Sequence, residues 1–74
     1  MVSIKEVRNY MEEIKTFVKQ NKDHIDEKTY NKNLMNKLEI CCDMIEGIPS
    51  PSMREKMNHE FFAFIGFCLS GEIL

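Results

Sequence analysis

Apolar residues recur every three or four positions in three stretches of the chain, and this spacing constrains the fold more than any other feature. In the first stretch the recurring residues are Ile4, Val7, Met11, Ile14 and Val18. Because an α-helix turns by about 100° per residue, these positions form one apolar stripe with charged residues opposite it. Ser3 and Glu6 stand just before the stripe in the spacing of a capping box. The sequence therefore predicts a helix over residues 4–20.

The second stretch predicts a helix over residues 26–46. Its stripe consists of Tyr30, Leu34, Leu38, Cys41 and Ile45. Asp23 and Asp26 are both suitable N-caps, and the pattern does not choose between them. Gly47 follows the stripe and is the residue type that ends helices in the left-handed conformation, with prolines shortly after it. The segment after residue 46 is therefore interpreted as a tight connector.

The third stretch predicts a helix over residues 51–70. Its stripe consists of Met53, Met57, Phe61, Phe64, Ile65 and Cys68. Two starts fit, because Ser50 could cap a helix that begins with proline, and Ser52 could open a capping box. A β-strand over residues 61–67 is an alternative, but the caps and the absence of a second strand pattern favour a helix. The sequence therefore predicts one compact all-α domain of three helices spanning residues 1–74.

A chain of 74 residues forms only a thin core, and chains of this size commonly gain stability from disulfides, metal or oligomerisation. The chain has three cysteines, so at least one must be unpaired within it, and two of them, Cys41 and Cys42, are adjacent. Both facts argue against disulfides. The first twenty residues are too charged for a signal peptide, so we expect a reducing, cytoplasmic compartment. The apolar run over residues 61–69 is too short to span a bilayer, which takes about twenty residues.

Three large apolar residues of the third stretch fall outside its stripe, namely Phe62, Phe67 and Leu69. The strip between them contains His59, Ala63, Gly66 and Ser70, and all of these except the histidine are small. Small residues let a second backbone approach, and Gly66 costs about 1 kcal/mol relative to alanine inside a helix, so it indicates a packing role. The pattern leaves two explanations open. Either the third helix is enclosed by the other two, or its outer side packs on another chain.

The second explanation predicts a protein interface of apolar and small residues. Its members are Phe62, Phe67, Leu69, Ala63, Gly66, Ile40 and Met44. Aromatic side chains are favoured anchors of such interfaces. We expect a small non-enzymatic regulator, adaptor or inhibitor that binds a protein partner or a copy of itself. The residue usage, with a single alanine, is typical of AT-rich coding sequences, so we expect a phage or viral protein acting on a host factor.

No pattern in the sequence points to catalysis, a cofactor or a metal. Cys41 and Cys42 would point about 100° apart on a helix, and His24 belongs to no ligand spacing. His59 and Cys68 would lie about 13 Å apart along one helix, too far for a nucleophile and its base. The three glycines form no phosphate-binding loop. We therefore expect no enzyme activity, no cofactor and no metal.

Nucleic-acid binding through the second helix, in the manner of a helix-turn-helix protein, is the alternative function. The polar residues suited to it are Lys28, Asn31, Lys32, Asn33, Asn36 and Lys37. The net charge of −2 disfavours binding to phosphate backbones. The connector after residue 46 is also longer than the usual turn of that motif. We therefore do not expect a nucleic-acid partner.

Overall fold

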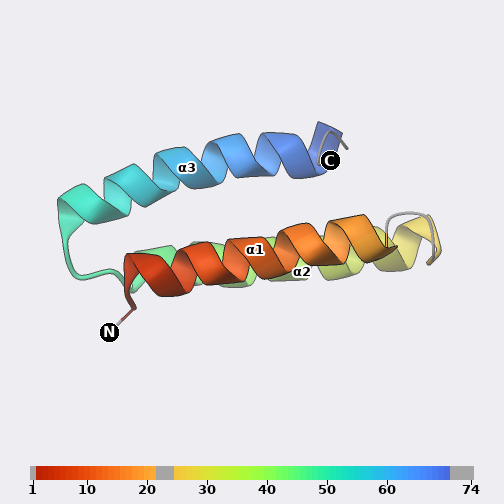
Figure 1. Ribbon diagram of the computed structural model, residues 1–74, viewed down its shortest axis with the longest axis horizontal. Coiled ribbons are helices and arrows are strands. Elements are labelled where there is room, and N and C mark those ends of the chain that lie inside the picture. The colour runs from red at the N-terminus through yellow and green to blue at the C-terminus, as the bar shows by residue number, and fades with distance from the viewer. Residues whose placement is uncertain (1, 22–24, 71–74) are drawn as a thin grey trace.

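The computed structural model describes residues 2–21 and 25–70, which form three α-helices (Figure 1). These are α1 (Ile4–Asn21), α2 (Glu27–Glu46) and α3 (Pro51–Ser70). The predicted all-α fold of three helices is confirmed. The chain runs along α1, returns along α2 and runs along α3 in the same direction as α1, and each helix contacts the other two. The Cα radius of gyration is 12.6 Å.

The first two helices begin at side-chain caps. Ser3 Oγ accepts a hydrogen bond from the backbone N–H of Glu6 at 3.2 Å. At the start of α2 the carboxylate of Asp26 accepts from the N–H of Thr29 at 3.0 Å, so Asp26 is the cap. This hydrogen bond lowers the pKa of the Asp26 carboxyl because it stabilises the charged form. Asp23, the other predicted cap, lies outside the described residues.

The start of α3 is settled by the residue before its proline. Ser50 Oγ accepts a hydrogen bond from the backbone N–H of Met53 at 3.4 Å, and Pro51 is the first helical residue. Proline suits this position because the first amides of a helix have no partner within the helix. Of the two predicted starts, the Ser50 cap is therefore correct.

Gly47 ends α2, but not in the predicted conformation. Its φ of −78° and ψ of −4° lie in the right-handed region, so the prediction of a left-handed stop was wrong. A Cβ atom at this position would lie 2.9 Å from Val2 Cγ2 and 3.3 Å from the carbonyl oxygen of Met44. Glycine fits here because Val2 passes close to the backbone, and not because the backbone needs a positive φ.

The core contains buried apolar side chains from all three helices and the connector. Its members are Val7, Ile14, Val18, Leu34, Leu38, Cys41, Ile45, Ile48, Met57, Phe61, Phe64 and Cys68. Met53 was predicted to join them, but this was wrong because 49% of its surface is exposed. Met53 lies in the first turn of α3, just after the connector, whose Ile48 side chain is buried in the core.

Three contacts show which sides of α2 and α3 face α1. The rings of Phe17 and Tyr30 stack with centroids 5.6 Å apart, and the ammonium of Lys37 lies 5.2 Å from the Phe17 centroid. On the other helix, both carboxylate oxygens of Glu60 accept from Arg8 Nη2 at 3.2 Å. Both partners of this ion pair are well exposed, so it adds at most about 1 kcal/mol of stability. It joins the surfaces of α1 and α3.

Candidate protein-interaction surface

Helices α1 and α2 cover only one side of α3. Phe61 and Phe64 are buried in the core, whereas Phe62, Phe67 and Leu69 are 75%, 52% and 65% exposed. Of the two explanations left open by the sequence, enclosure of α3 by the other helices does not hold for the described chain. We call the exposed side the outer face of α3. Its residues are Phe62, Ala63, Gly66, Phe67 and Leu69.

The middle of the outer face carries only small side chains and is open to solvent. Ala63 and Gly66 are both exposed, and a Cβ atom added to Gly66 would have no heavy atom of another element within 4 Å. No contact within the described chain therefore requires a glycine at position 66. A glycine inside a helix nevertheless costs about 1 kcal/mol relative to alanine. The larger side chains stand on either side of this low strip. Phe67 lies toward the α1 side, and Phe62 and Leu69 lie toward α2.

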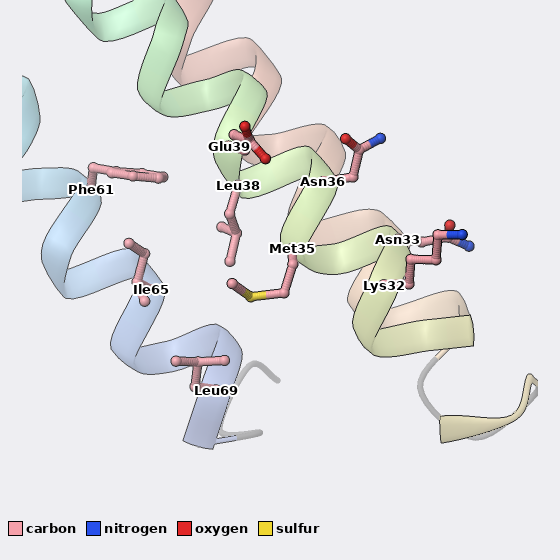
Figure 2. A pocket seen from close by; sticks show the side chains of 9 residues that line it. All are labelled: Lys32, Asn33, Met35, Asn36, Leu38, Glu39, Phe61, Ile65 and Leu69. Carbon is pink, nitrogen blue, oxygen red and sulfur yellow. The ribbon is translucent and has the colours of Figure 1, made fainter. Parts of the chain in front are cut away.

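A groove of about 700 Å³ between α2 and α3 borders the outer face (Figure 2). Its residues are Lys32, Asn33, Met35, Asn36, Leu38, Glu39, Phe61, Ile65 and Leu69. Figure 2 shows Met35 and Leu38 pointing toward α3, whereas Asn33 and Asn36 point away from it. Leu69 belongs to both the groove and the outer face, so the exposed apolar surface continues from α3 to the exposed Met35 of α2.

Ile40 and Met44 are not adjacent to the outer face. Met44 is half-buried against the core, and it follows Lys37 by seven residues on the side of α2 that faces α1. Ile40 is exposed, but it points about 160° away from Leu38, which faces α3. The structure therefore brings together Phe62, Ala63, Gly66, Phe67 and Leu69, and leaves the two α2 residues elsewhere.

The groove residue Met35 was missed as part of the site. The sequence places it at the flank of the α2 stripe, about 60° from Leu38, and that angle is compatible with either a core or a surface position. Its place opposite Leu69 depends on how far apart α2 and α3 sit at this end of the bundle. No signal in the sequence alone reports that spacing.

The two buried thiols of the described chain have raised pKa values. Burial raises the pKa of Cys41 to about 11, with the neighbouring Cys42 adding to the shift, and burial also raises the pKa of Cys68. A raised thiol pKa is opposite to the shift that activates a nucleophile. Residues 2–21 and 25–70 contain no group of three His, Cys, Asp or Glu side chains able to hold a metal ion. His24 lies outside these residues.

The polar residues of α2 are spread around the helix. Lys28, Lys32 and the asparagines are exposed, but they cover roughly 200° of the circumference and do not form one face. The ammonium of Lys37 is held over the Phe17 ring. Among the described helices, none is long and apolar enough to cross a membrane.

Comparison of the chain with protein-family models, with curated proteins and with solved structures finds no match. The functional argument therefore depends on the geometry of the outer face and the groove beside it. Both surfaces are mostly apolar, and both lie around the second half of α3.

Proposed function

We propose that this chain is a small non-enzymatic protein-interaction module that acts as a regulator, adaptor or inhibitor by binding protein through the outer face of α3. The observation that carries the proposal is the exposure of Phe62, Phe67 and Leu69 on a helix whose other side forms the core. Grouped large apolar side chains on a soluble surface mark interaction sites more often than isolated ones do. Phenylalanine buries a large area on binding while few of its bonds lose rotational freedom.

The size of the outer face supports the proposal. With roughly 200 Å² for each large side chain, the exposed parts of the three residues amount to roughly 350 Å² of apolar surface. This lies within the range of roughly 300–600 Å² for the largest patch of a monomeric protein, which is often functional. The groove beside Leu69 extends the apolar surface further toward α2.

The charge distribution supports the same role. No residue from Phe61 to Leu69 carries a charge, so a partner could cover this part of α3 without removing an ion from water. The three cysteines are unpaired, which fits our proposal of a reducing, cytoplasmic setting. The residue usage is typical of AT-rich coding sequences. The proposal therefore includes a phage or viral source, with a host factor as the partner.

The proposal is tested with three immobilised baits, namely the wild-type chain, Phe67→Asp and Met53→Asp, each exposed to a cell lysate to which the free wild-type chain has been added. Met53 is a matched control because it is also an exposed apolar residue of α3, yet it lies in the first turn, away from the outer face. We expect a bound protein that wild type and Met53→Asp retain at equal levels and that Phe67→Asp loses at least tenfold. Equal binding by all three baits, or binding by none, would contradict the proposal.

A further inference from the structure

We infer that the protein bound at the outer face is a second copy of this chain, with the two α3 helices packed antiparallel about a two-fold axis that passes between Phe64 and Ile65. This inference rests on the proposed function, because it names the partner of the same surface. Three observations support the inference: the order of residues 62–67, the position of the charges along α3, and the arrangement of the helices in layers.

The outer face has an approximate two-fold symmetry of its own. Residues 62–67 read Phe-Ala-Phe-Ile-Gly-Phe, with a phenylalanine at each end and a small residue next to each. At about 100° and 1.5 Å per residue, Phe62 and Phe67 lie roughly 70° to either side of the middle of the face. Ala63 and Gly66 lie roughly 30° to either side. A half-turn about the centre of the face thus exchanges the two phenylalanines and the two small residues.

This symmetry makes the face complementary to itself. On one chain Phe62 and Phe67 occupy two diagonal corners of the face and leave the other two corners empty. A second chain related by a two-fold axis across the helices places its own Phe67 beside Phe62, and its Phe62 beside Phe67, in those empty corners. Ala63 and Gly66 of the two chains then meet in the middle, where the open space around Gly66 allows the backbones to approach closely.

The charges of α3 favour the antiparallel arrangement. All of them lie in its first half, at Arg54, Glu55, Lys56 and Glu60, while residues 61–69 carry none. A parallel pair would place identical charges at the same height and align the two helix dipoles. An antiparallel pair sends the two charged halves to opposite ends of the interface, so that only the uncharged halves meet.

The arrangement of the helices leaves room for this pairing. Helices α1 and α2 contact α3 from one side, and the described chain places no element over its outer face (Figure 1). In the pair, each α3 becomes an inner layer with helices on both sides. A helix apolar around most of its circumference belongs in such a position, and small domains commonly complete a thin core by oligomerising.

The buried area predicts a dimer that dissociates on dilution. The three large side chains supply roughly 350 Å² per chain and roughly 700 Å² for the pair, before the small residues and the edges are counted. Standard stable interfaces bury roughly 1,600 Å², and weaker ones less than roughly 1,200 Å². We therefore expect a dissociation constant on the order of micromolar rather than nanomolar.

The test measures the mass of the purified, reduced chain by sedimentation from about 1 µM to about 500 µM, a range that brackets this affinity. We expect the mass to rise from 8.8 kDa to twice that value. For Gly66→Ala we expect at least a tenfold weaker dimer, because two added methyl groups separate the backbones. In dilute solution the same variant should melt about 3–6 °C higher, since alanine favours the helix and meets no other element.

Opposite effects on self-association and on melting temperature are not expected from a residue with a purely structural role. A chain that stays monomeric at every concentration, one that forms only assemblies larger than a dimer, or a Gly66→Ala variant that dimerises as well as wild type would overturn the inference. The bait experiment separates this failure from failure of the proposed function. If Phe67→Asp still loses a bound protein while the chain is monomeric, only the identity of the partner is wrong.

Discussion

Met57→Ala is expected to lower the free energy of unfolding by about 3 kcal/mol, because it removes a fully buried side chain from the centre of the core. Met57 is 0% exposed and lies on the inner side of α3, in the same core cluster as Ile14 and Ile45. A domain of this length has a total stability of roughly 4–11 kcal/mol. The substitution therefore removes a large part of the stability and lowers the melting temperature by more than about 10 °C.

Met53→Ala is the matched control, since it makes the same chemical change one turn earlier on the same helix. Met53 is half exposed, so its truncation should change stability by less than about 0.5 kcal/mol. Urea unfolding followed by circular dichroism, at concentrations low enough to keep the chain monomeric, measures both variants. Equal losses for Met57 and Met53 would contradict the assignment of the two sides of α3.

Phe62→Asp is expected to raise the dissociation constant of the dimer by more than hundredfold while leaving the monomer folded. Phe62 is the most exposed of the large apolar residues of the outer face, so its replacement removes almost no core packing. In the pair its carboxylate would lie against the apolar face of the second chain without an ion partner. Taking a charge from water without compensation costs several kcal/mol, which is far more than a small interface can offset.

Sedimentation and circular dichroism of Phe62→Asp are compared with those of Ile40→Asp. Ile40 is also an exposed apolar residue, but it lies on α2 and points away from α3. The control should keep the dimer of wild type, and both variants should keep its helical content. Loss of helical content in dilute Phe62→Asp would place Phe62 in the core, and an unchanged dimer would remove it from the interface.

The fold was largely predictable because helix formation depends on local patterns. Apolar spacing of three and four predicted the three helices, and Ser3 predicted the start of α1. The choice between Ser50 and Ser52 was not predictable, since both satisfy the same local rule. The structure shows that Ser50 is the cap. The exposure of Met53 was missed because a helical wheel gives the direction of a side chain but not whether a neighbouring helix reaches that height.

The outer face could be predicted in part for the same reason. Phe62, Phe67 and Leu69 lie at angles that no single core can cover together with Phe61, and all three are exposed. The grouping of Ile40 and Met44 with them was not reliable, because it depends on how α2 is rotated about its own axis. That rotation follows from tertiary contacts such as those of Lys37 with α1.

Photo-crosslinking tests most directly the central claim that the outer face of α3 contacts a second copy of the chain. Phe62 is replaced by p-benzoylphenylalanine in one variant and Met53 in another, and each purified, reduced variant is irradiated at high concentration. We predict a product of twice the 8.8 kDa chain mass from the Phe62 variant and almost none from the Met53 variant. No product from the Phe62 variant, or equal yields from both, would contradict the claim.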